Sequence, residues 1–181
     1  INGKNSMRAE LTQIMGFLHL AEQLKLELRH SWLSNGRQES VAEHSWRLAL
    51  MVVSLAPYLE HPVNVEKALK MAIIHDIAEA EAGDIAVFEC QTAEAKRAKH
   101  QAEEQAIDNI RARLPAPLGE ELYQLWHEYE ARETLEAKFV TALDKIEVFI
   151  QHNEADLDTW LHLEKLMVFQ DKWKDKHCEF D

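Results

Sequence analysis

Residues that interrupt helices are scarce in this sequence. Only five Gly and four Pro occur among 181 residues, and Ala, Leu, Glu, Lys and Gln dominate the stretches between them. This usage favours helices and gives little punctuation for strands. The length suits one hydrophobic core and is too short for two ordinary domains. We therefore expect an all-α fold, with residues 1–181 forming a single compact domain of six or seven helices.

Two capping patterns set the start of helices near the middle of the chain. Residues 40–43, Ser-Val-Ala-Glu, spell a capping box, so a helix is expected to begin at Ser40. Asn64 can cap a second helix that runs to about Ala80. Loops are expected at 29–36 and at 114–119. Further helices are expected at about 5–25, packed in the core, at 92–113, lying on the surface, and at about 118–129, 133–151 and 158–173.

Charge and cysteine content narrow the class of protein. The formal net charge is −12, with 20 Lys and Arg against 32 Asp and Glu, and this disfavours nucleic acid, because backbone binding needs a cationic surface. Cys90 and Cys178 are too few for a disulfide framework. The sequence shows no charged-then-apolar leader and no apolar run of about 18 residues. We expect a soluble, cytoplasmic protein with no nucleic-acid or membrane partner.

Two histidines and two aspartates from separate helical stretches form a candidate metal-binding set: His44, His75, Asp76 and Asp144. Their two neutral imidazoles and two carboxylates balance a divalent cation, and mixed nitrogen and oxygen ligation suits Mn, Fe, Co, Ni or Zn better than Ca or Mg. A lone histidine is more often a packed or surface residue. Asp76 and Asp144, however, lie among apolar residues, where an unpaired carboxylate is costly. The set predicts one divalent transition metal ion, which keeps positions open for water and substrate if it accepts six ligands.

Five short words in a fixed order carry a family resemblance. They are RHSW at 29–32, ESVAEHS at 39–45, HDIAE at 75–79, GDI at 83–85, and EAKFV leading to LDK at 136–145. With these words the chain resembles the HD-domain metal-dependent phosphohydrolases, in the branch that contains the 5′-deoxynucleotidases. The similarity runs from about Leu24 to about Gln151. It implies a helical HD domain whose motif-bearing core is followed by the helix at about 158–173.

The resemblance also implies roles for residues beside the metal set. Glu79 would exchange protons around the reacting phosphate, and Asp84 would orient water or substrate; their plain alternatives are a solvated acid and a turn residue. Arg29 would hold the phosphate and Trp32 would fit against the sugar, so that a 2′-hydroxyl would clash. In the family's bacterial pattern an Arg and a Trp are adjacent, whereas here two residues separate them. Lys145 is expected to pair with the phosphate, or else with Glu147 or Glu79.

The expected function is that of a metal-dependent phosphomonoesterase acting on nucleoside 5′-monophosphates, above all deoxynucleotides. Two alternatives stay open: a phosphodiesterase or nucleoside triphosphate hydrolase on the same scaffold, and a non-catalytic nucleotide sensor with a structural metal. His100 and His127 raise the further alternative of a second metal. The resemblance also implies a homodimer, for which apolar residues of the final helices are suited: Trp160, Leu163, Leu166 and Trp173.

Overall fold

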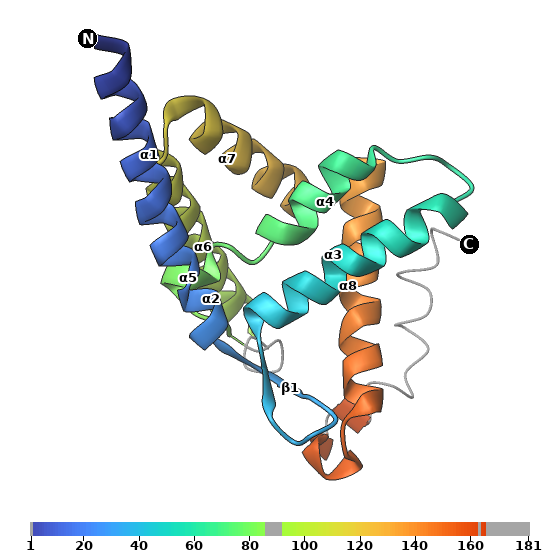
Figure 1. Ribbon diagram of the computed structural model, residues 1–181. Coiled ribbons are helices and arrows are strands. Elements are labelled where there is room, and N and C mark those ends of the chain that lie inside the picture. Colours follow the sequence, from blue (N-terminus) through green and yellow to red (C-terminus); the bar gives the residue numbers. More distant parts are fainter. Residues whose placement is uncertain (1, 86–91, 163, 166–181) are drawn as a thin grey trace.

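Helices make up most of the computed structural model, which describes residues 2–85, 92–162, 164 and 165 (Figure 1). Within this part, six helices have ten or more residues: α1 (Asn2–Ala21), α3 (Val41–Leu55), α4 (Val65–Ile74), α6 (Ala93–Arg113), α7 (Ala116–Ala131) and α8 (Leu135–Glu154). The shorter elements are α2 (Gln23–Leu26), α5 (Glu79–Ala82), the 3-10 turns η1 (Ala56–Tyr58) and η2 (Leu157–Thr159), and the strands β1 (Leu28–Trp32) and β2 (Gln38–Ser40). The prediction of an all-α class is confirmed. The one-domain organisation of residues 1–181 stays a prediction.

The two predicted caps are confirmed. The Ser40 hydroxyl accepts a hydrogen bond from the Glu43 amide, and the Glu43 carboxylate accepts one in return from the Ser40 amide at 2.9 Å. The Asn64 side chain accepts a hydrogen bond from the Lys67 amide at 3.2 Å. Each cap of this kind stabilises a helix by about 1 kcal/mol. The first cap fixes the start of α3 and thereby the position of His44, which lies in its first turns.

A hairpin replaces the loop that the sequence predicts at 29–36. Leu28 of β1 pairs with Ser40 of β2 and Trp32 pairs with Gln38, with an irregularity between the two pairs. The connection closes through a hydrogen bond from the Gly36 amide to the Leu33 carbonyl at 2.9 Å. Gly36 has a φ of +82°, which favours glycine. The strands are too short and polar to show alternation in the sequence, so the prediction of a loop was wrong for residues 29–32, whereas residues 33–36 do form a loop.

The helix expected at 64–80 ends earlier, at Ile74. The Ile77 amide then bonds the Ile74 carbonyl and the Glu79 amide bonds the Asp76 carbonyl, both at 3.0 Å. These three-residue bonds tighten the chain into a turn between α4 and α5. No proline or glycine marks this change in the sequence. His75 and Asp76 therefore lie in a tight turn and not within a continuous helix.

Other helix boundaries also differ from those that the sequence predicts. Helix α7 includes most of the expected loop at 114–119, because Pro117 lies in its first turn, where its missing amide does no harm. The expected helix at 5–25 is divided between α1 and α2. Only the beginning of the helix expected at 158–173 is described, and there η2 takes up Leu157–Thr159. Cys90, Cys178 and the residues from 166 onward lie outside the described residues.

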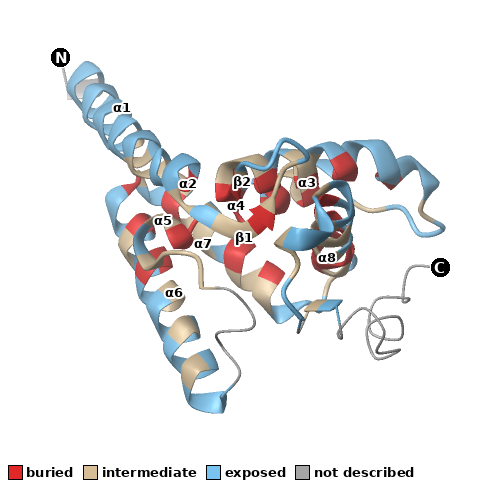
Figure 2. Ribbon diagram, turned by 90° about the horizontal axis from the view of Figure 1, so that it is seen from below, coloured by how far each residue is buried: buried red, intermediate tan, exposed pale blue. Residues whose placement is uncertain are grey.

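Most of the buried residues come from α3, α4, α7 and α8, and Figure 2 shows such buried stretches in red, for example on α3 and α8. Its largest buried apolar side chains include Leu48, Met71, Trp126 and Val140. Helix α6, which the sequence predicts to lie on the surface, buries Ile107 and Ile110 on one face.

Helix α1 projects from the body and is mostly exposed (Figures 1 and 2). Leu11 and Leu18 keep more than half of their surface, at 56% and 53% exposed. The prediction that the first helix packs in the core was wrong for most of its length. Within the described ranges, the helices are all too short or too polar to cross a membrane.

Candidate metal centre

Three chain segments bring the predicted metal-binding residues together. The Nε2 atom of His75 lies 3.0 Å from Asp76 Oδ2, and the Nε2 atom of His44 lies 4.0 Å from the same oxygen. One ligand atom from each of His44, His75 and Asp76 lies within 4.8 Å of the other two. His44 comes from the capped start of α3, and the other two come from the turn after α4. The tight turn directs two adjacent residues toward one point.

Asp144 of α8 completes the group. Its Oδ1 atom lies 3.1 Å from His44 Nε2. Tyr129 Oη donates a hydrogen bond to Asp144 Oδ2 at 3.3 Å, and Lys145 Nζ donates one at 2.7 Å. Burial by itself would raise the pKa of Asp144, but Lys145 and the two histidines hold that pKa well below its usual range. The carboxylate is therefore ionised and able to bind a cation.

The Nε2 nitrogens of the two histidines face carboxylate oxygens at close range, His44 toward Asp144 and His75 toward Asp76. Nε2 of His44 and Nε2 of His75 are both buried and make no hydrogen bond within the described part of the chain. The Nδ1 nitrogens of both rings contact oxygen atoms: His75 Nδ1 lies 3.0 Å from the Ala72 carbonyl oxygen, and His44 Nδ1 lies 2.5 Å from Glu147 Oε2. Such outer contacts are typical of histidines that bind a metal through the other nitrogen. The donor set fits a divalent transition ion.

Arg29 lies directly beside this group. Its Nη1 atom donates a hydrogen bond to Asp76 Oδ2 at 3.3 Å, and its Nε atom lies 3.6 Å from Glu39 Oε2. Although burial would raise the pKa of Asp76, His75 and Arg29 hold it below its ordinary value. The Arg29 guanidinium is thus held in direct contact with one of the candidate ligands, Asp76. The sequence did not suggest a role for Glu39, which is 2% exposed.

Glu79 lies at the start of α5, close to the group but not hydrogen-bonded to it. It is buried, and its Oε1 atom is 3.8 Å from Lys99 Nζ. Burial, followed by the charges of Asp76 and Asp84, raises the pKa of Glu79 from 4.5 to about 10. The carboxyl group therefore holds a proton at neutral pH in the metal-free protein. Lys99 is a neighbour that sequence reasoning missed, since α6 reads as a solvated helix.

Asp84 follows the glycine that ends α5. Gly83 has a φ of +77°, and the Asp84 amide donates a hydrogen bond to Glu27 Oε1 at 3.0 Å. Burial raises the pKa of Asp84, against the opposing charges of Arg29 and Lys99. The turn therefore places Asp84 against Glu27 and close enough to Arg29 and Asp76 for their charges to act on its carboxyl group.

Trp32 and Lys145 are the other two residues expected to bind substrate, and their contacts differ from those of Arg29. The carbonyl of Trp32 accepts a hydrogen bond from Gln151 Nε2 at 2.7 Å, and its ring meets that of His30 edge-on at 4.7 Å. This anchors the end of β1 to α8. Lys145 pairs with Asp144, a partner that the sequence did not suggest.

His100 and His127 form a separate contact. Each lies close to the same oxygen of Glu104, with distances of 3.5 Å and 3.7 Å. The His100 ring stacks on Trp126 at 6.4 Å. No group of candidate ligands among the described residues joins either histidine to His44 or His75.

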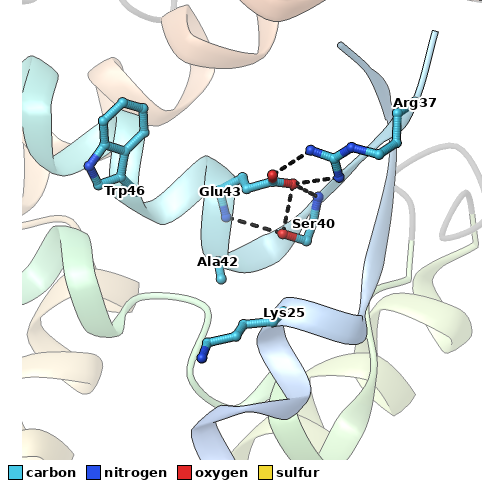
Figure 3. Close-up of a pocket in the computed structure, with 6 residues that line it drawn as sticks. All are labelled: Lys25, Arg37, Ser40, Ala42, Glu43 and Trp46. Atoms are coloured by element: carbon cyan, nitrogen blue, oxygen red, sulfur yellow. Dashed lines mark hydrogen bonds and ion pairs between the residues drawn. The ribbon is translucent and has the colours of Figure 1, made fainter. Parts of the chain in front are cut away.

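A surface pocket of about 350 Å³ lies elsewhere, between α2 and α3 (Figure 3). Two of its charged lining residues pair with each other, because Glu43 contacts Arg37; Glu43 also contacts Ser40. Its other lining residues are Lys25, Ala42 and Trp46. None of the six belongs to the predicted site.

Comparisons with known proteins give the chain a family. It is 38% identical over 143 residues to 5′-deoxynucleotidase HDDC2 of Homo sapiens. The aligned region covers 78% of this chain and 67% of that protein. A solved structure described as a predicted metal-dependent phosphohydrolase from Magnetospirillum magnetotacticum MS-1 is similar, with a TM-score of 0.73 and 35% identity over 81% of this chain and 72% of the other. A conserved hypothetical protein from Pyrococcus furiosus has a TM-score of 0.67 and 32% identity, with coverage of 90% and 95%.

The family model described as HD domain matches residues 21–179. This range includes every residue of the cluster around His44, His75, Asp76 and Asp144. Since the match covers most of the chain and the structural relatives share its helical architecture, the chain belongs to the HD-domain family.

Proposed function

We propose that this protein is a metal-dependent phosphohydrolase that removes phosphate from nucleoside 5′-monophosphates, with deoxynucleotides as the preferred substrates. The observation that carries the proposal is the pair of buried Nε2 atoms of His44 and His75, which make no hydrogen bond among the described residues and face the carboxylates of Asp144 and Asp76 at 3.1 Å and 3.0 Å. The similarity to a relative named 5′-deoxynucleotidase supports the substrate class.

The four candidate ligands would hold one divalent transition metal ion, of which Mn, Fe, Co, Ni and Zn suit the donor atoms. When bound, such an ion supplies a water of lowered pKa and neutralises charge on the phosphate. A buried guanidinium next to the ligands can bind a second phosphate oxygen, and Arg29 is held in that position by Asp76 and Glu39. Lys145 adds positive charge on the other side, at Asp144.

Two acidic residues would handle protons and orientation. Glu79, whose carboxyl group is protonated at neutral pH in the metal-free protein, donates a proton to the departing 5′-oxygen. Asp84 orients the attacking water or a substrate hydroxyl. Trp32 packs against the sugar, where a ribose 2′-hydroxyl would clash. The products are a nucleoside and inorganic phosphate.

We further propose that the protein acts in the cytoplasm as a homodimer. The location rests on the cysteine content, and the dimer rests on the family resemblance. Of the four apolar residues suited to the dimer contact, the structure describes Trp160 alone. The indole nitrogen of Trp160 donates a hydrogen bond to the His152 carbonyl at 2.9 Å. The other three, Leu163, Leu166 and Trp173, lie outside the described residues.

The function can be tested by measuring phosphate release from dAMP and AMP, with para-nitrophenyl phosphate and its bis ester alongside. The protein is first stripped of metal and then resupplied with Mn, Co, Ni, Zn or Mg. We expect faster release from dAMP than from AMP. Equal rates would remove the role of Trp32 in sugar selection. Cleavage of the diester alone would favour a phosphodiesterase, and no release with any metal would favour a nucleotide sensor.

A further inference from the structure

The side of His44 that faces away from the candidate metal position contacts a buried carboxylate. His44 and Glu147 are both fully buried, with 0% of each side chain exposed, and Nδ1 of His44 lies 2.5 Å from Oε2 of Glu147. The two residues are far apart in the sequence and come from α3 and α8. The other oxygen of Glu147 lies 3.7 Å from Nε of Arg47. The proposed function gives Glu147 no role of its own.

A hydrogen bond explains this contact better than a second metal ion does. Glu39, His44 and Glu147 offer three ligand atoms within 4.8 Å of one another. However, two ligands of one zinc ion, each about 2.0–2.2 Å from it, stand about 3 Å apart or more. The 2.5 Å between Nδ1 and Oε2 is shorter than this and suits a charge-assisted hydrogen bond. Glu39 is in turn next to Arg29.

We propose that Glu147 is a positioning residue for the metal site, which accepts the Nδ1 proton of His44 and so keeps the Nε2 lone pair directed at the metal. A neutral imidazole carries one N–H, and the acceptor at one nitrogen decides which nitrogen is free to bind. His44 has a charged acceptor, whereas His75 has a neutral one, the Ala72 carbonyl. His44 is therefore the more firmly oriented ligand, because its Nδ1 faces a charged acceptor. This inference rests on the proposed ligand role of His44.

Glu147→Gln is the direct test, because glutamine keeps the size but loses the charge, and its amide can donate to Nδ1 and favour the wrong tautomer. The readout is Co(II) affinity, measured by competition with a chelator, together with the visible spectrum of the Co(II) protein. We expect an affinity about 10–100-fold weaker than wild type and a changed spectrum. In zinc-loaded protein with labelled histidine, we also expect the downfield Nδ1 proton of His44 to shift upfield in the variant.

Glu154→Gln is the matched control. Glu154 also lies on α8 and pairs with Arg47, at 2.7 Å, but it does not contact His44. It should leave Co(II) affinity and the spectrum unchanged. If Glu147→Gln fails to fold by circular dichroism, Glu147→Asp keeps the charge and draws the carboxylate away from Nδ1, so it should weaken Co(II) binding as well.

Wild-type affinity and spectrum in the folded Glu147 variant would overturn the proposal. His44→Ala separates this failure from a failure of the ligand assignment. If His44→Ala binds Co(II) as tightly as wild type, His44 is not a ligand and the proposed centre itself is wrong. If His44→Ala loses binding while the Glu147 variant does not, only the role of Glu147 is refuted.

Discussion

Replacing Glu79 with glutamine should stabilise the metal-free protein while it removes turnover. Burial and the charges of Asp76 and Asp84 raise the pKa of Glu79 from 4.5 to about 10 in the folded chain. At pH 7 the unfolded chain has this carboxyl group ionised, whereas the native state has it protonated. Taking up that proton on folding costs about 3 kcal/mol, from the 2.5-unit gap between pH 7 and the unfolded pKa. Glutamine avoids this cost.

The pH dependence gives the sign of the effect. Because the native state binds one more proton than the unfolded state between pH 4.5 and about 10, the contribution of Glu79 to stability falls as the pH rises. The Glu79→Gln variant has no carboxyl group at this position, so it does not lose this stability as the pH rises. Its advantage in the free energy of unfolding should be below about 1 kcal/mol at pH 5 and reach about 3 kcal/mol at pH 7. Urea denaturation of metal-stripped wild type and variant at both pH values measures the difference. An advantage that stays constant with pH would refute the reasoning.

The same variant should lose catalysis with its metal in place. Loss of a general acid typically lowers turnover by about 10²–10⁴-fold, whereas Co(II) affinity should stay at the wild-type value because Glu79 is not a proposed ligand. Glu103→Gln is a suitable control, since Glu103 is the other carboxylate beside Lys99, at 3.4 Å. It should keep both turnover and affinity. Full turnover in metal-loaded Glu79→Gln would show that the proton comes from elsewhere.

Four further changes test other parts of the site. Asp76→Ala should remove bound metal and activity together, as measured by metal analysis and phosphate release; activity without metal would contradict the ligand set. Arg29→Ala should lower kcat/KM for dAMP by about 10–100-fold, because a hydrogen bond to a charged group contributes about 1.5–3 kcal/mol. An unchanged kcat/KM would exclude phosphate binding by Arg29. Trp32→Ala should bring the dAMP to AMP rate ratio toward one. Ser40→Ala should lower the free energy of unfolding by about 1 kcal/mol, measured by urea denaturation.

The parts of the structure that the sequence predicts are those with local signals. The caps at Ser40 and Asn64 are formed by neighbouring residues, so their patterns can be read directly. The scarcity of Gly and Pro likewise predicts the helical class. The four candidate ligands were found because residue type and spacing match a family, and the structure brings these residues together.

The missed features depend on contacts between distant segments. The α4 helix stops at Ile74 without a proline or glycine, so only packing against the rest of the fold can explain the turn. Glu147 is a charged residue next to apolar ones on α8, one turn after Asp144. That position is a usable signal, since a fully buried acid on a ligand-bearing face needs a partner. Lys99 gave no such signal, because α6 is charged along most of its length.

The charge balance of the site links these observations to the need for a cation. With Glu79 protonated, five carboxyl groups lie around the site against four cationic side chains. The acids are Glu39, Asp76, Asp84, Asp144 and Glu147, and the cations are Arg29, Arg47, Lys99 and Lys145. If the five acids are ionised, this leaves an excess of one negative charge in a partly desolvated region, where unpaired charge is costly. A divalent cation reverses the sign of this excess. The same excess repels a phosphate dianion, so metal binding is the step that makes the site suitable for a nucleotide.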